Sequence, residues 1–102
     1  MAQFDILRNP QSGVYPLVVD LQHETLARLS TRIVAPMIAV KRYGRKPVTR
    51  LNPIARVKNV EYVILVQDLA SILASDLGEV VGTLSARRPD LIGALDLMFT
   101  GV

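Results

Sequence analysis

Apolar residues are grouped in short segments over the first three quarters of the chain, with polar or turn-forming residues between them. Short runs of this kind, rich in Val and Ile, are typical of β-strands. The predicted strands begin at Phe4 and then span residues 15–21, 33–40, 54–57, 60–66 and 69–74. Pro36 indicates an edge position or a bulge in the third of them, because proline cannot donate a hydrogen bond within a sheet.

The segments between these strands carry their own signals. Lys58 and Asn59 predict a two-residue hairpin turn, because Asn tolerates the positive φ that such turns require. Residues 9–13 form a turn-rich loop, and residues 23–29 are expected to form a loop or a single helical turn. Residues 76–79 are expected to turn the chain toward a C-terminal helix.

The apolar spacing changes near the end of the chain. From Leu91 onward apolar residues recur at intervals of three and four, which predicts an amphipathic helix. Ser85 is expected to accept a hydrogen bond from the first turn, where Pro89 is tolerated and Asp90 suits the positive end of the helix dipole. Gly101 is expected to end the helix.

Strands followed by one helix predict a mainly β fold, in which a single antiparallel sheet curls around its core and the C-terminal helix packs against it. No linker or repeat divides the chain, so residues 1–102 are expected to form a single domain. A chain of this length buries only about 60–65% of its unfolded surface, which makes oligomerisation an expected supplement to its stability.

The composition indicates in which compartment of the cell the protein is expected. Although 50% of the residues are hydrophobic, no apolar run approaches the roughly 20 residues that span a bilayer. The first residues resemble no secretory signal, and the chain has no cysteine for a disulfide. We therefore expect a soluble, cytoplasmic protein with no membrane partner.

The net charge of +3 is concentrated in one place. Residues 41–50, called the basic segment below, hold five of the 12 basic residues and no acidic one, which leaves 7 basic against 9 acidic residues elsewhere. Gly44 and Pro47 interrupt the segment, so we expect an exposed loop or a protruding hairpin. Such a segment can hold phosphates, attract an acidic protein chain or simply keep a loop solvated.

The side chains needed for catalysis are scarce. His23 is the only histidine, the carboxylates are scattered and no glycine-rich phosphate loop occurs. We expect His23 to be a surface residue, and we predict no catalytic residue, no metal site and no cofactor. Asp20 and Gln22 can either satisfy backbone groups at a strand end or touch a partner.

Three segments carry a resemblance to a known family. They are Gln3-Phe4 with Val19-Asp20-Leu21-Gln22, then residues 31–37, and finally Leu97-Met98-Phe99-Thr100-Gly101-Val102. Their order and spacing resemble the CcdB family, toxins of bacterial toxin–antitoxin modules that poison DNA gyrase. The resemblance implies a small SH3-like barrel with a C-terminal helix, as in CcdB and MazF-like toxins, assembled as a two-fold homodimer.

The resemblance also implies where the partners bind. In the family the last three residues contact the DNA gyrase A subunit, and they correspond here to Thr100, Gly101 and Val102. Thr100 stands where the well-known plasmid member has tryptophan, so an indole-to-guanidinium stack worth on the order of 2 kcal/mol is lost.

The family's antitoxin is acidic and partly disordered, and its C-terminal segment folds onto the toxin. We expect a CcdA-like antitoxin to lie on the loop from Arg8 to Gly13 and on the basic segment. The residues expected to contact it are Arg8, Asn9, Lys41, Arg42, Arg45 and Lys46.

Two other functions stay open on the residues alone. An endoribonuclease toxin of the MazF/Kid type could use an arginine with a hydroxyl neighbour; the candidates are Arg32, Arg50 or Arg56 with Thr31 or Thr49. A barrel that binds nucleic acid through the basic segment has only Tyr43 there for base stacking, and we expect no direct sequence-specific nucleic-acid binding.

Overall fold

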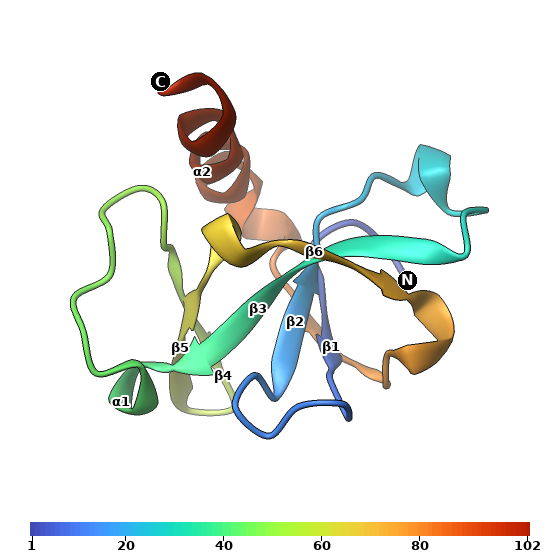
Figure 1. The fold of residues 1–102 in the computed structure, drawn as a ribbon, viewed down its shortest axis with the longest axis horizontal. Helices are drawn as coiled ribbons and strands as arrows, with labels where there is room; N and C mark the ends of the chain where they lie inside the picture. Colours follow the sequence, from blue (N-terminus) through green and yellow to red (C-terminus); the bar gives the residue numbers. More distant parts are fainter.

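The computed structural model describes residues 1–102, which form a mainly β fold with one long C-terminal helix (Figure 1). The strands are β1 (Asp5–Arg8), β2 (Leu17–Asp20), β3 (Thr31–Ala39), β4 (Ile54–Val57), β5 (Val60–Ile64), β6 (Ala70–Leu73) and β7 (Val80–Thr83). The helices are α1 (Val40–Tyr43) and α2 (Arg88–Thr100), with 3-10 turns η1 (Glu24–Leu26), η2 (Val66–Asp68), η3 (Ala74–Asp76) and η4 (Ser85–Arg87).

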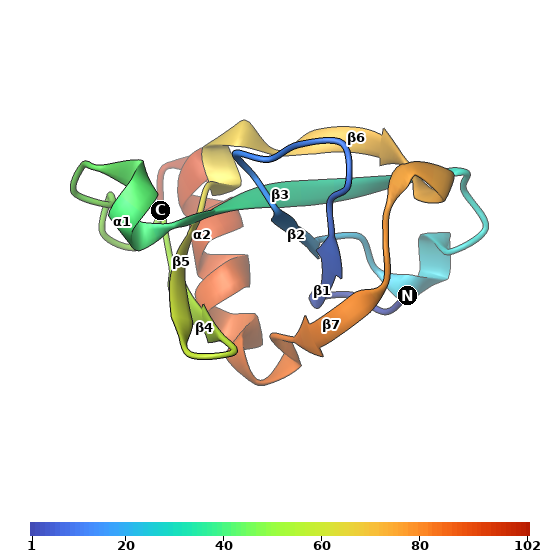
Figure 2. The same ribbon diagram turned by 90° about the horizontal axis from the view of Figure 1, so that it is seen from below.

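The seven strands form one antiparallel sheet in the order β4-β5-β3-β2-β1-β7, with β6 paired to β3. The sheet curls into a half-barrel, and α2 lies across its inner side (Figure 2). The predicted fold class, a curled antiparallel sheet with a C-terminal helix against it, is therefore confirmed. Neither α-helix is both long and apolar enough to cross a bilayer.

Strand β3 is the centre of the sheet, and the prediction that Pro36 marks an edge or a bulge is wrong. On one side β3 pairs with β2; on the other, residues 31–34 pair with β6 and residues 37–39 pair with β5. Pro36 lies where β3 changes partner, so its missing N–H interrupts no continuous ladder. Its carbonyl still accepts a hydrogen bond from the Leu65 N–H at 2.9 Å.

The β4–β5 hairpin follows the local prediction. Lys58 and Asn59 connect the strands with φ of 49° and 68°, the left-handed conformation that matches the twist of the strands. The predicted single turn after β2 is present as η1, and the predicted extended segment after η2 is present as β6.

Strand β7 was not expected from the sequence. A turn does follow η3, but residues 80–83 then pair with β1, whose register shifts between Ile6 and Leu7. The segment before β7 comes close to β1 at Gly78, which has no side chain, and the Gly78 N–H donates to the Arg8 carbonyl at 2.9 Å. A Cβ on Gly78 would lie only 2.9 Å from the Cβ of Arg8.

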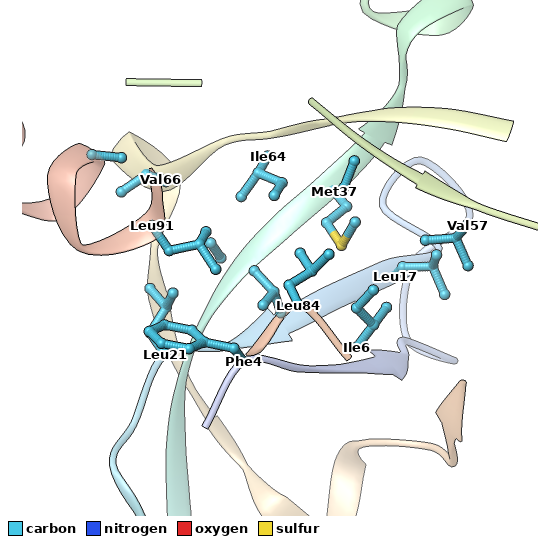
Figure 3. Packing of buried hydrophobic residues seen from close by; sticks show 14 residues of the cluster. Phe4, Ile6, Leu17, Leu21, Met37, Val57, Ile64, Val66, Leu84 and Leu91 are labelled. Atoms are coloured by element: carbon cyan, nitrogen blue, oxygen red, sulfur yellow. The ribbon is translucent and has the colours of Figure 1, made fainter. Parts of the chain in front are cut away.

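The hydrophobic core fills the concave side of the sheet (Figure 3). Inward residues of β1, β2, β3, β4 and β5 pack there with Phe4, which precedes β1, and with Leu91 and Ala94 of α2. Leu91 is 1% exposed, and full burial of a leucine contributes about 1.5–3 kcal/mol. The apolar stripe near the start of α2 therefore anchors the helix to the sheet.

The start of α2 differs from the prediction in one respect. Ser85 lies in η4 and is exposed, and the residue before the helix is Arg87, which makes no side-chain cap. The Ser85 backbone carbonyl accepts from the N–H of Arg88, the first residue of α2, but the Ser85 side chain makes no cap hydrogen bond, so this part of the prediction is wrong. Pro89 and Asp90 lie in the first turn as expected, and Asp90 accepts from Arg87 Nε at 2.8 Å.

Candidate partner-binding site

Residues 100–102, called the tripeptide below, lie at the end of α2 and outside the core. The helix ends at Thr100, and Gly101 adopts φ of 80°, so the predicted glycine stop is confirmed. The Gly101 N–H donates to the Leu97 carbonyl at 2.9 Å, and Thr100 Oγ1 donates to the Asp96 carbonyl at 2.7 Å. These two bonds fold the first part of the tripeptide back onto the last helical turn.

The end of α2 presents apolar side chains to solvent. Phe99 is 70% exposed and Val102 is 77% exposed, whereas the fully buried residues of the helix, Leu91 and Ala94, lie in its first half. Figure 1 shows this end of α2 extending beyond the sheet. Exposed large apolar side chains that are grouped in this way are typical of surfaces that bind another protein.

The basic segment lies beside the end of α2. Arg50 Nη2 donates to the main-chain oxygen of Val102 at 2.7 Å, and this contact joins residues that are 52 positions apart in the chain. Arg50 itself has a left-handed backbone, with φ of 71°. Sequence reasoning missed the contact because no local pattern links the two residues.

The basic segment itself is exposed, as expected, although it begins with the short helix α1 and not with a loop. Lys41, Arg42, Arg45 and Lys46 are all exposed. The Arg45 guanidinium lies over the Tyr43 ring, 5.5 Å from its centroid. The charges therefore face solvent, where they can attract an acidic chain.

The loop after β1 is held by its own polar groups. Asn9 Nδ2 donates to the Tyr15 carbonyl at 3.0 Å, and Arg8 forms an exposed ion pair with Glu79 at 2.6 Å. Of the six residues expected to contact an antitoxin, Arg8 thus already has an acidic partner on the surface, and Asn9 supports the loop.

A groove connects this loop to the basic segment on the face of the sheet opposite α2. It consists of two adjoining concavities of about 350 and 330 Å³ that share Tyr15 and Asp68. Asn9 lines the first and Arg45 the second, while Val18 of β2 and other sheet residues contribute apolar side chains. We call this feature the outer groove. The structure brings Asn9 and Arg45 to one groove, but Arg8, Lys41, Arg42 and Lys46 do not line it.

Asp20, Gln22 and Arg32 form a buried polar network. Asp20 accepts from Arg32 Nε at 3.0 Å, and the two side chains are 0% and 3% exposed. The Gln22 side chain donates to the Leu26 and Thr31 carbonyls and accepts from the Ile33 N–H. The interpretation that Asp20 and Gln22 satisfy backbone groups is confirmed, and Arg32 is not accessible to an RNA substrate.

His23 is a surface residue, as expected. Its Nδ1 accepts from the Thr25 N–H at 3.1 Å and caps η1. The neighbouring Glu24 carboxyl accepts hydrogen bonds from the Glu24 backbone N–H and from the Gln3 backbone N–H, and these bonds lower the pKa of Glu24. No group of three or more His, Asp or Glu side chains lies together in the structure in a way that could hold a metal ion.

Comparison with models of protein families gives a match to the family described as CcdB protein. The match covers residues 3–101, nearly the whole chain, and so includes the sheet, the basic segment, α2 and the first two residues of the tripeptide. Together with the half-barrel and its C-terminal helix, this match shows that the chain belongs to the CcdB family of toxin–antitoxin toxins that act on gyrase.

Proposed function

We propose that this protein binds the DNA gyrase A subunit through Thr100, Gly101 and Val102 and traps the enzyme's cleaved DNA complex. The observation that carries the proposal is the end of α2, which is exposed, apolar and ordered by hydrogen bonds, in a chain that belongs to the CcdB family. The function is one of binding, with no catalytic residue of its own.

The proposed contact with gyrase differs from that of a family member with tryptophan at the position of Thr100. Thr100 is exposed, but its hydroxyl already donates to the Asp96 carbonyl, so the hydroxyl proton supports the helix end and is not free for a partner. Phe99 and Val102 are the large exposed side chains, and Gly101 lets a partner approach the backbone closely. Without an indole the contact is expected to be weaker by about thirtyfold, or on the order of 2 kcal/mol.

Deletion of residues 100–102 tests the site directly. Because the tripeptide lies outside the core, the free energy of unfolding should change by less than about 1 kcal/mol, while gyrase binding should be lost. Thr100→Trp should instead tighten gyrase binding. Thermal melts and pull-downs with the gyrase A subunit measure both variants. A large loss of stability on deletion, or unchanged gyrase binding, would contradict the assignment.

A cleavage assay tests the activity. Purified protein with gyrase and ATP should convert supercoiled plasmid into linear DNA that is released when the enzyme is denatured, and RNA incubated with the protein should stay intact. RNA cleavage in the absence of gyrase would instead support the ribonuclease alternative.

We also propose that the cognate antitoxin places an acidic, apolar segment along the outer groove and the basic segment. The groove offers apolar residues such as Val18 and Val34, with Arg45 lining one end, and Lys41, Arg42 and Lys46 are exposed in the same basic segment as Arg45. Opposite charges of this kind mainly raise the rate of association.

Charge removal tests this site. Lys41→Ala combined with Arg42→Ala should slow antitoxin association at low salt severalfold, and the difference from the unmodified protein should shrink above about 0.15 M salt, where charges are screened. Arg28→Ala removes an exposed charge elsewhere and is the control. Surface plasmon resonance measures the rates. Equal association rates for the double variant and the control would disprove the role of the basic segment.

A further inference from the structure

We propose that Arg50 is a positioning residue that holds the tripeptide in one conformation for its partner. The effect on gyrase affinity rests on the proposed function, whereas the effect on the order of the tripeptide does not. Three features carry the inference: a hydrogen-bonded turn that presents Arg50, the backbone conformation of Arg50 itself, and the lack of any other hydrogen bond to Val102.

The turn that presents Arg50 is closed at both ends. The Val48 N–H donates to Asn52 Oδ1 at 2.9 Å, and the Asn52 N–H donates to the Val48 carbonyl at 2.9 Å. Asn52 Nδ2 then donates to the Ile64 carbonyl at 3.1 Å and to Gln67 Oε1 at 2.7 Å. Asn52 is 5% exposed, so a buried amide fixes this turn to β5 and η2.

Arg50 lies in the middle of this turn with φ of 71°. A residue with a Cβ is disfavoured in the left-handed region, where glycine or asparagine is the usual choice. Such a conformation persists only where the surroundings impose it. Here Asn52, two residues after Arg50, imposes it through its hydrogen bonds to Val48. The arginine therefore occupies a position that backbone preference alone would give to glycine, and its side chain reaches the tripeptide.

The hydrogen bond from Arg50 holds Val102, which the hydrogen bonds of helix α2 do not reach. Thr100 and Gly101 are tied to the last turn of α2 by their own bonds to Asp96 and Leu97. Val102 lies beyond these bonds, is 77% exposed and has only the 2.7 Å bond from Arg50 Nη2. A segment held by several bonds loses less conformational entropy when a partner binds it. Arg50 thus prepares Val102 for contact.

Nuclear magnetic resonance relaxation combined with gyrase titration tests the proposal on the full chain. The variants are Arg50→Ala, which removes the donor, Arg50→Lys, which keeps a charged donor, and Arg28→Ala as an equal loss of charge elsewhere. The amide of Val102 should become mobile on the nanosecond scale in Arg50→Ala while the amides of α2 stay rigid. Gyrase affinity should fall severalfold, up to about tenfold, as expected for one lost hydrogen bond. Arg50→Lys should recover part of both effects, and Arg28→Ala should change neither.

Each other outcome has a definite meaning. An unchanged Val102 amide in Arg50→Ala would overturn the proposal. A lower gyrase affinity with an ordered tripeptide would also overturn it, because Arg50 would then contact gyrase directly. Absence of gyrase binding by the unmodified protein would refute the proposed function, while the relaxation data would still decide whether Arg50 orders the tripeptide.

Discussion

At the scale of single residues, the Asp20–Arg32 pair shows how a charge is accommodated in a domain this small. Both side chains are almost fully buried, yet every buried polar side-chain atom in the protein has a hydrogen-bond partner. Asp20 also accepts from the Gln22 N–H at 2.9 Å, so the carboxylate is satisfied on both oxygens. Buried pairs contribute little net energy, but the loss of one partner leaves an uncompensated charge.

Removal of one member of this pair should therefore be costly. Arg32→Met, which roughly keeps the side-chain length, should lower the free energy of unfolding by about 3–5 kcal/mol because Asp20 stays buried without its partner. Combining it with Asp20→Asn should cost less than the sum of the two single changes. Urea denaturation followed by circular dichroism measures the three values, and strictly additive losses would show that the two side chains are not coupled.

At the scale of elements, the contact between β1 and β7 depends on a missing side chain. Gly78 lies against Arg8, and the two segments exchange hydrogen bonds through Gly78 N–H to the Arg8 carbonyl and Arg8 N–H to the Glu79 carbonyl. The three nearest atoms that a new Cβ would meet all belong to Arg8 of β1: its Cβ at 2.9 Å, its carbonyl oxygen at 3.2 Å and its carbonyl carbon at 3.6 Å. The edge of the sheet cannot move aside without breaking this pairing.

Gly78→Ala is thus expected to lower the free energy of unfolding by about 1–3 kcal/mol through overpacking against β1. Gly93→Ala is the matched control, because no heavy atom lies within 4 Å of its new Cβ and alanine favours the helix by up to about 1 kcal/mol. Opposite shifts of the thermal midpoint are expected for the two variants. A Gly78→Ala protein as stable as the Gly93→Ala protein would contradict the packing at this edge.

The sequence predicted elements where local rules decide and failed where distant pairing decides. The hairpin at Lys58 and Asn59 depends on two φ angles, and the stop at Gly101 depends on one, so both were predictable. Strand β7 is only four residues long and is stabilised by pairing with β1, some 75 residues earlier in the chain. The role of Pro36 depends on which strands meet at β3, which no local pattern contains.

The same distinction applies to the candidate site. The resemblance implied a contact role for the tripeptide, which stays a proposal, and the structure shows that its residues are exposed. The bond from Arg50 joins a loop to a helix end through tertiary folding, so the sequence could indicate only that Arg50 belongs to a basic segment. Arg32 was a possible ribonuclease residue from composition, and only the structure shows that it is buried against Asp20.

At the scale of the whole molecule, much apolar surface stays exposed. Eleven large hydrophobic residues are exposed, among them Leu26 and Leu29 after β2 and Phe99 and Val102 at the end of α2. A small domain with such a surface is stabilised when two copies pair. Membership of the CcdB family implies dimerisation in general, and we propose a two-fold homodimer.

Light scattering at micromolar concentration should accordingly give about twice the chain mass of 11.2 kDa. A dimer that covers part of this exposed apolar surface should also make the thermal midpoint rise with protein concentration. Dilution to nanomolar concentration, followed by mass photometry or fluorescence anisotropy, gives the dissociation constant. A strict monomer at micromolar concentration would argue against the dimer.

The position of the tripeptide outside the core has a consequence for evolution and for genetic selection. On the proposed function, substitutions at Thr100 and Val102 are expected to alter what the toxin recognises with little penalty in folding, so target preference can drift while the scaffold is retained. Cells that survive expression of the toxin should accordingly carry two classes of mutation. Changes in residues such as Phe4 or Leu91 should remove the protein from the cell, whereas changes in the tripeptide should leave it at full abundance and harmless.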